Sequence, residues 1–202
     1  VEDVHIGPEG IRLDVIGGDE PHGLCGSGIL AVVRELVRNG LVTRRGAFAK
    51  PEDFEVGDYR RDILRYNGNK REALLYSSGE TELLVTQSDV RQVQLAKGAI
   101  RSGIEVLLSH GGLTYEDIDK VLIAGQFGAH LPAESLLQIG LLPPVTEDKL
   151  AYAGNSAKSG AVAALLSDEV KEEMEDLAKH IQYIELGSSD NYERLFAKCL
   201  LF

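Results

Sequence analysis

The sequence predicts a layered α/β fold with a mainly parallel, mixed sheet flanked by helices. Segments with strand character alternate with segments of helical periodicity along most of the 202 residues. Lys120–Ala124 is a short apolar run, typical of a parallel strand that is buried on both faces. Glycine-rich turns separate this and other candidate strands from the helices that follow. Such alternation favours a sheet covered by helices.

The N-terminal elements are expected to be two short strands and a helix. Residues 3–6 and 11–16 read as strands on either side of the turn at residues 7–10. A helix is predicted over residues 28–39, because apolar side chains recur three and four positions apart, at Ile29, Val32, Val33, Leu36 and Val37. Gly40 follows where glycine commonly ends a helix.

The next stretch has the weakest periodicity. Residues 41–71 are polar, carry charge of both signs and are expected to be loop. Strands are expected at residues 73–76 and 82–85. Residues 41–85 are therefore treated as an irregular excursion from the fold.

The clearest helix signal runs from Ser88 to His110. Ser88 is a plausible N-cap, and Asp89 is favourable in the first turn. The expected apolar stripe consists of Val93, Ala96, Ile100, Ile104 and Leu107. Beyond this helix, Thr114–Asp117 resembles a capping box that opens a short helix.

The C-terminal part predicts further alternation. After the strand at 120–124, Pro132 opens a helix to about Ile139. A strand, two helices, a strand and a final helix follow, at residues 150–153, 156–166, 167–180, 181–186 and 192–201. Ser167 can cap the acidic helix at 167–180, whose carboxylates form a solvated face or dock a basic partner.

Composition excludes several classes of protein. The net charge of −11, from 21 Lys+Arg against 32 Asp+Glu, opposes sequence-independent binding to nucleic acid. The apolar runs are too short to span a membrane. The two cysteines and five dispersed histidines form no ligand set at short spacing, so no metal site is expected. Reduced cysteines and a cytoplasmic location are the default.

The first glycine cluster, Gly23–Gly28, precedes a helix. Its glycines and the positive helix end could cradle an anion, or Ser27 could cap the helix while the glycines make the turn and permit close packing. Packing is the favoured interpretation. Cys25 lies beside the helix N-terminus, which can lower the pKa of a thiol, but a buried structural thiol is favoured.

The long helix carries a polar face formed by Gln94, Lys97, Arg101 and Glu105. Gly98 is a poor helix former and opens room for a flat group, beside which Lys97 and Arg101 could stack on a base or contact ribose and phosphate. A solvated face with an Arg101–Glu105 pair explains the same pattern, and on its own this simpler interpretation is favoured.

Two further glycine-rich turns follow strands. Gly125-Gln126-Phe127-Gly128 comes directly after the buried strand, where ligands of open α/β sheets bind, although an ordinary turn with Phe127 packed inside is about equally consistent. Residues 154–161, which include Gly154 and Asn155, either line a cleft or permit tight helix packing. These two interpretations are compatible.

The order of these motifs is more informative than any one of them. The segments GLCGSGIL, TQSDVRQVQLAKGAIRSGI, VLIAGQFGAHL, ESLLQIGLLP and AGNSAKSGAVAALLS occur in this order. The series resembles the C-terminal domain of the reductive activators of corrinoid-dependent enzymes, a family of the acetate and sugar kinase, heat-shock chaperone and actin (ASKHA) superfamily. The resemblance covers residues 11–202 and is loosest over 44–85.

The resemblance implies an actin-like, ribonuclease-H-like lobe and an activity. Such proteins spend ATP, with Mg²⁺, to return Co(II) corrinoid to the Co(I) state. Gly125–Gly128 match the adenosine motif, and Gln94, Lys97, Gly98 and Arg101 match the adenine-contacting helix. The segment 154–161, with Gly154 and Asn155, looks like the second connecting helix, at the hinge between two lobes. The implied partner is a corrinoid iron–sulfur protein or a methyltransferase corrinoid protein, and a homodimer is allowed.

Parts of the family pattern are missing from this sequence. The two phosphate loops of the superfamily, with their aspartates, are not visible, and neither are the four cysteines of a plant-type 2Fe–2S cluster. We therefore expect residues 1–202 to be the second, C-terminal lobe alone, without the N-terminal 2Fe–2S domain, the linker and the phosphate-loop lobe. No catalytic residue is assigned, and the isolated chain is expected to be inactive.

Three alternatives remain open from the sequence. A small-molecule kinase of the same superfamily would need both phosphate loops. An activator ATPase of the 2-hydroxyacyl-CoA dehydratase type would need cysteines for a cluster at a subunit interface, for which Cys25 is the candidate. A non-catalytic docking domain with a degenerate nucleotide cleft would need neither.

Overall fold

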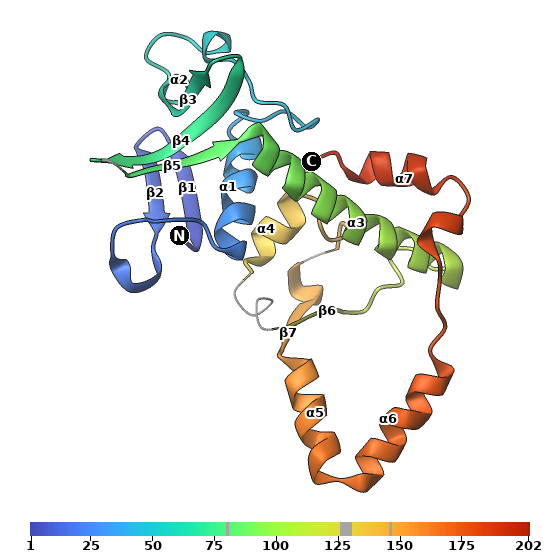
Figure 1. The fold of residues 1–202 in the computed structure, drawn as a ribbon. Helices are drawn as coiled ribbons and strands as arrows, with labels where there is room; N and C mark the ends of the chain where they lie inside the picture. The colour runs from blue at the N-terminus through green and yellow to red at the C-terminus, as the bar shows by residue number, and fades with distance from the viewer. Residues whose placement is uncertain (80, 126–130, 146) are drawn as a thin grey trace.

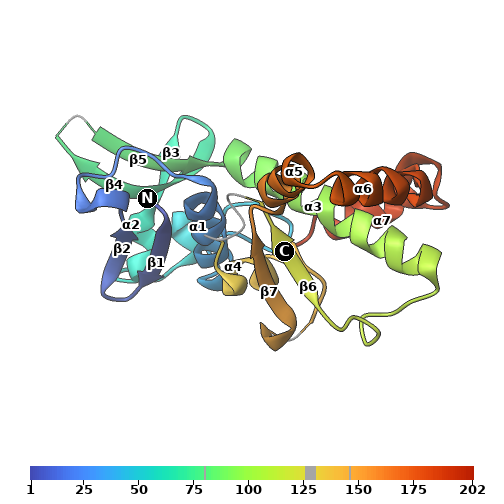
Figure 2. The same ribbon diagram turned by 90° about the horizontal axis from the view of Figure 1, so that it is seen from below.

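A computed structural model describes residues 1–79, 81–125, 131–145 and 147–202. Helices and small sheets alternate, as Figures 1 and 2 show from two directions. The expected α/β fold is confirmed. No helix in the described ranges is long and apolar enough to cross a membrane.

The N-terminal hairpin packs against the first helix. Strands β1 (Asp3–Gly7) and β2 (Gly10–Asp14) are antiparallel, and helix α1 (Gly26–Arg38) lies against β1. Most of the buried apolar side chains gather here, among them Val4, Val32, Leu36 and Phe48. This cluster is the main core of the described structure.

Residues 41–71 are more regular than expected. Helix α2 (Tyr59–Ile63) leads into strand β3 (Leu64–Asn67), which forms one antiparallel sheet with β4 (Lys70–Ser78) and β5 (Thr81–Thr86). Gly68 turns the chain from β3 to β4 with a φ of +60°. Asn67 pairs with Lys70, so the loop is Gly68-Asn69. A two-residue loop that begins with glycine is a signal for a tight hairpin, so the sequence did carry this information.

The expectation of a mainly parallel sheet is wrong in its strand directions. Among the described residues, β6 (Val121–Ala124) and β7 (Leu150–Gly154) are the parallel pair, and the other two sheets are antiparallel. The reason is connection length, because short turns force the other neighbouring strands into antiparallel hairpins. The longer connection from β6 to β7 contains helix α4 (Ala133–Gln138).

The long helix α3 (Gln87–Gly111) forms as expected, but it begins differently. Its N-cap is Thr86, not Ser88, and the Thr86 hydroxyl accepts a hydrogen bond from the Asp89 amide. The short helix expected after Thr114 is absent. Asp117 accepts the capping hydrogen bonds from Thr114 at 2.8 Å, but the chain enters β6 too soon for a helical turn.

Three helices complete the described chain. Helices α5 (Ser156–Leu166) and α6 (Asp168–His180) form an arm that projects from the body, and α7 (Tyr192–Cys199) lies along α3 (Figure 1). The Ser167 hydroxyl caps α6, as expected. The strand expected at 181–186 does not form: Ile181 and Tyr183 are exposed and no described strand pairs with this segment.

Candidate functional site

The predicted site falls at the carboxyl ends of the two parallel strands. Gly125 directly follows β6 and Gly154 is the last residue of β7, and the Gly125 amide donates a 2.8 Å hydrogen bond to the Gly154 carbonyl. Their φ angles are +107° and +62°, which strongly favour glycine. Among the described residues, a Cβ added to either would meet no atom within 4 Å, so this part of the structure leaves the backbone open to a ligand at this edge.

Asn155 stands at the same edge and begins helix α5. Its side-chain oxygen accepts a 3.0 Å hydrogen bond from the Lys158 amide. The helix N-terminus thus follows directly after Gly154, and its free amides and dipole favour an anionic group there. Gln126, Phe127 and Gly128, the rest of the expected adenosine motif, lie outside the described residues.

The polar face of α3 is buried, not solvated. Gln94, Lys97 and Gly98 are among the buried residues of the helix, whereas Ile100 and Leu107 of the expected apolar stripe are about half exposed. The stripe was therefore assigned to the wrong face. The reason is tertiary: α7 and the residues after it cover the polar face.

Each polar group on this face already has a partner. The Gln94 side-chain amide donates to the Leu200 carbonyl at 3.0 Å, and the Lys97 ammonium donates to the Leu201 carbonyl. Gly98 makes room for a side chain from the same segment, because a Cβ there would lie 2.7 Å from Leu200 Cδ2.

Arg101 lies further along the same face of α3 and contacts residues both within and outside the helix. Its guanidinium donates to Glu105 at 2.7 Å, to the Leu142 carbonyl at 2.6 Å and to the Tyr115 hydroxyl at 2.8 Å. The expected Arg101–Glu105 pair is thus present, and two further contacts fix its orientation.

A cavity of about 290 Å³ opens beside these side chains. Four basic residues line it, together with one acid, Glu105, and two aromatic rings; the basic and aromatic residues are Arg44, Lys97, Arg101, Lys198, Tyr115 and Phe202. In a chain of net charge −11, this concentration of cations suits an anionic ligand with a flat ring. Burial lowers the pKa of Lys97 to about 8.

Sequence reasoning found Lys97 and Arg101 but missed the rest of the cavity. Arg44 precedes α3 in the sequence and Lys198 and Phe202 follow it at the C-terminal end, so only the fold brings them beside Lys97 and Arg101. No local motif marks them.

The turn at residues 23–28 is a packing feature. Cys25, not Ser27, is the N-cap residue of α1, and its Sγ lies 3.1 Å from the Ser27 hydroxyl. A Cβ at Gly28 would overlap the Val1 carbonyl oxygen, so glycine permits the close approach. Burial raises the pKa of the Cys25 thiol, but hydrogen bonds from Ser27 and Gly28 outweigh it and the pKa is lowered.

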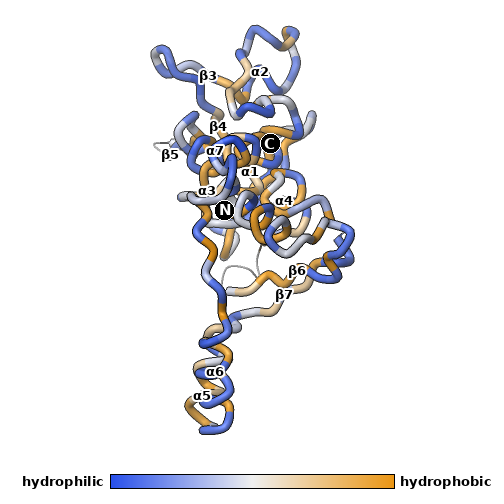
Figure 3. The backbone as a smooth tube through the Cα atoms, turned by 90° about the vertical axis from the view of Figure 1, so that its right-hand side faces the viewer, coloured by the Kyte–Doolittle hydropathy of each residue, from blue (hydrophilic) through white to orange (hydrophobic). Residues whose placement is uncertain are grey.

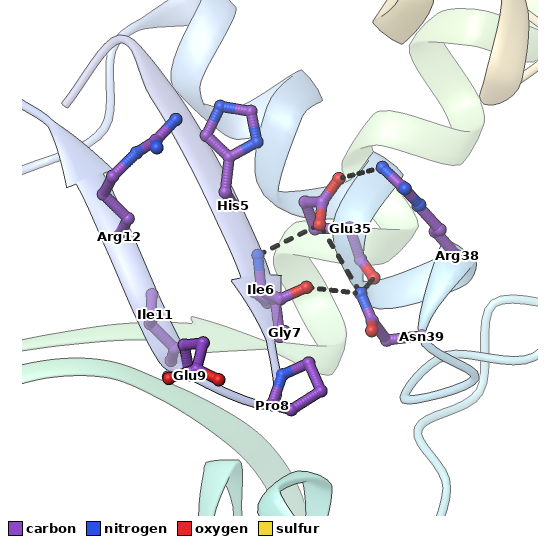
Figure 4. A pocket seen from close by; sticks show the side chains of 11 residues that line it. His5, Ile6, Gly7, Pro8, Glu9, Ile11, Arg12, Glu35, Arg38 and Asn39 are labelled. Carbon is purple, nitrogen blue, oxygen red and sulfur yellow. Dashed lines mark hydrogen bonds and ion pairs between the residues drawn. The ribbon is translucent and has the colours of Figure 1, made fainter.

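A second hollow, of about 540 Å³, lies at the end of the N-terminal hairpin (Figure 4). The polar groups around Ile6 are paired with one another. Glu35 accepts from the Ile6 amide at 3.0 Å, and Asn39 donates to the Ile6 carbonyl at 3.2 Å. None of the predicted site residues lines this hollow.

On the same hairpin, Asp3, His5 and Asp14 bring possible ligand atoms within 4.8 Å of one another. Arginines already balance both carboxylates. Arg34 lies 3.2 Å from Asp3, and Arg12 lies 3.7 Å from Asp14. Ion pairing therefore accounts for this cluster.

The fold and the glycine-bounded strand edge define an ASKHA-type α/β domain. A family model described as the C-terminal domain of RACo, the ASKHA domain, matches residues 1–202. The chain belongs to this family.

The proteins similar to this chain include two curated proteins and a solved structure. Corrinoid activation enzyme RamQ of Eubacterium limosum is 32% identical over 196 residues, which are 95% of this chain and 33% of RamQ. The [Co(II) methylated amine-specific corrinoid protein] reductase of Methanosarcina barkeri is 25% identical over 114 residues, 55% of this chain and 21% of that protein. The structure of a reductive activator for corrinoid, iron–sulfur protein superposes with a TM-score of 0.86 at 30% identity, over 99% of this chain and 32% of its own. The chain thus spans about a third of RamQ and of the solved activator.

Proposed function

We propose that this chain is the nucleotide-binding lobe of an ATP-dependent reductive activator that returns Co(II) corrinoid proteins to Co(I). The observation that carries the proposal is the Gly125–Gly154 pair at the carboxyl edge of β6 and β7. Its open backbone suits the close approach of a nucleotide. The names of the relatives supply the class of reaction.

The residues that would hold ATP fall into two groups. Gly125, Gly154 and Asn155 would form the edge against which the nucleotide lies. Gln94, Lys97, Gly98 and Arg101 would contact its base and ribose from α3. When bound, ATP would supply the free energy for an unfavourable reduction. The phosphate loops, Mg²⁺ ligands and 2Fe–2S cluster are assigned to the remaining two thirds of a longer protein.

The residues named above would bind the nucleotide with different affinities in two relative arrangements of the lobes. Only a difference in interaction energy between two states can drive a conformational change. Helix α5 begins at the Gly125–Gly154 strand edge, where the nucleotide is proposed to lie. It is therefore suited to transmit the difference in interaction energy to the rest of the protein. A corrinoid protein is the proposed recipient, either a corrinoid iron–sulfur protein or a methyltransferase corrinoid protein.

The α5–α6 arm supports a role inside a larger protein. Leu165 and Leu166 are 84% and 79% exposed, and Leu177 on α6 is 65% exposed. Figure 3 shows the arm extending from the body with hydrophobic segments along both helices. We infer that the remainder of the longer protein covers this arm, since apolar side chains grouped at an exposed site mark interaction surfaces.

Calorimetric titration of MgATP and MgADP tests the proposal. We expect tight binding to the full-length protein and weak binding to residues 1–202, with no ATP turnover by the latter. Corrinoid reduction, followed by the absorbance of Co(I), should require ATP in the full-length protein. Absence of nucleotide binding in both forms would overturn the proposal and favour a docking domain. Stoichiometric cluster iron in residues 1–202 would instead favour the dehydratase-type activator.

A further inference from the structure

The last three residues, Leu200–Phe202, lie over the face of α3 that is proposed to contact the nucleotide. Their carbonyl oxygens accept hydrogen bonds from two of the four proposed contact residues: Leu200 from Gln94 and Leu201 from Lys97. Lys97 is only 1% exposed as a result. A nucleotide cannot reach either group while this segment stays in place.

The same segment also fills the space above Gly98. A Cβ at Gly98 would lie 2.7 Å from Leu200 Cδ2 and 3.5 Å from Phe196 Cε2. This is the space that the sequence assigns to a flat ligand group. One opening therefore has two candidate occupants, a leucine side chain and a nucleotide base.

Two further contacts hold the end of the segment. Phe202 exchanges hydrogen bonds with Arg44: its amide donates to the Arg44 carbonyl at 2.9 Å, and its carbonyl accepts from Arg44 Nε at 3.0 Å. The Phe202 ring lies 5.4 Å from the Lys97 ammonium. The carbonyls and the ring thus give Lys97 and Arg44 the acceptor and the π-face that a nucleotide would give them.

Displacement of the segment would not require α7 to leave. Helix α7 has its own anchor on α3, where the Tyr192 hydroxyl lies 3.1 Å from the Ser102 hydroxyl. The segment begins where α7 ends, at Cys199. Rotation of the backbone after Cys199 would free Gln94 and Lys97 and remove Leu200 from above Gly98, while Phe196 of α7 stays beside Gly98.

We propose that Leu200–Phe202 is a built-in plug that competes with nucleotide for the polar face of α3. The proposal rests on the proposed function. With the plug in place, Gln94, Lys97 and Gly98 are withheld from the ligand. With the plug displaced, Gln94 and Lys97 are free to contact a nucleoside phosphate, and Leu200 no longer fills the space above Gly98. The plug lowers the apparent affinity and links nucleotide binding to displacement of residues 200–202 from α3.

Titration of MgATP into the full-length protein tests the plug. We compare the unmodified protein with the double variant Leu200→Ala/Phe202→Ala, which removes the side chain above Gly98 and the ring beside Lys97. We expect the dissociation constant to fall about tenfold, the factor for a plug that is in place in roughly nine molecules of ten. Leu107→Ala is the matched control, since Leu107 lies on the opposite, exposed face of α3 and should leave the affinity unchanged.

Hydrogen exchange in the unmodified protein provides a second measurement. MgATP should accelerate amide exchange in the peptide containing residues 200–202, because the Phe202 amide loses its Arg44 acceptor. Unchanged or slower exchange with ATP bound, or an equal or weaker affinity in the double variant, would overturn the plug and leave nucleotide binding intact. Absence of ATP binding to every form would overturn the proposed function itself.

Discussion

The ammonium group of Lys97 donates its hydrogen bond to the main-chain carbonyl of Leu201, which lies 104 residues further along the chain. This bond joins the middle of α3 to the end of the described structure. Burying an ammonium group is costly unless it is hydrogen-bonded, so the contact accounts for how a lysine with 1% exposure is tolerated. The contact also means that access to the Lys97 ammonium depends on where residues 200–202 lie.

The first prediction concerns the pH dependence of stability at Lys97. Desolvation lowers the pKa of Lys97 from 10.5 to about 8 in the folded state. Between these values the folded protein has released a proton that the unfolded chain retains, so raising the pH stabilises the fold. The urea midpoint of the unmodified protein should therefore rise relative to that of Lys97→Met between about pH 8 and 10.5.

Lys171→Met is the control for this experiment, since Lys171 is exposed on α6. This control should follow the unmodified protein across the same pH range. Parallel curves for Lys97→Met and the unmodified protein would contradict a depressed pKa at Lys97.

Helix α3 also shows which features of the fold can be predicted from the sequence and which cannot. Its length was predictable because helical periodicity and an N-terminal capping pattern are local. Its buried face was not, because the apparent apolar stripe includes Ile100 and Leu107, which are exposed. Burial of Gln94 and Lys97 depends on Leu200 and Leu201, and no local pattern connects residues so far apart.

More of the strand edge formed by Gly125 and Gly154 could be predicted from the sequence. Gly125 follows an apolar run and Gly154 precedes a helix, so both positions were assigned to turns at strand ends. Their adjacency depends on the parallel pairing of β6 and β7, which the long connection favours. The N-terminal hairpin was predicted, but β3 was not, because the Gly68-Asn69 turn lies in a polar segment with weak strand periodicity.

The second prediction tests the packing function of the first glycine turn. Gly28→Ala places a methyl group where the Val1 carbonyl oxygen lies, so the backbone must shift. We expect a loss of about 1–3 kcal/mol in the free energy of unfolding, the usual cost of overpacking. Gly26→Ala, two residues earlier, meets nothing within 4 Å and should be nearly neutral. Similar urea midpoints for the two variants would show that the close approach is not required.

The third prediction concerns the strand edge. Gly125→Ala forces a residue with a side chain to hold a φ of +107°, although there is space for the methyl group. The expected cost is about 1–3 kcal/mol of backbone strain. Relief of this strain would shift the backbone next to Gly154 and weaken MgATP binding in the full-length protein. Gly23→Ala is the control, since Gly23 has an ordinary φ and open space. Full ATP affinity in a folded Gly125→Ala variant would remove this edge from the nucleotide site.

The last prediction concerns Arg34, which joins the N-terminal hairpin, α1 and α4. Its guanidinium is buried and donates to the Ser135 hydroxyl and to the Val4 carbonyl, both at 2.9 Å. It also lies 3.2 Å from Glu35, which is itself only 2% exposed. Arg34→Met keeps the length of the side chain but removes the charge that neutralises Glu35. Breaking a buried ion pair from one side costs about 3–5 kcal/mol, so the urea midpoint should fall strongly.

Arg38→Met provides the comparison, because Arg38 pairs with the same Glu35 carboxylate at 3.5 Å from a side chain that is 60% exposed. Exposed ion pairs contribute about 0–1 kcal/mol, so this variant should unfold close to the unmodified protein. Comparison of the two variants thus separates the effect of burial from the effect of charge. Both arginines neutralise Glu35, but only Arg34 does so out of contact with water. An equal loss of stability in the two variants would mean that Glu35 is neutralised by the pair jointly, and that Arg34 is not the residue that holds α4 against the hairpin.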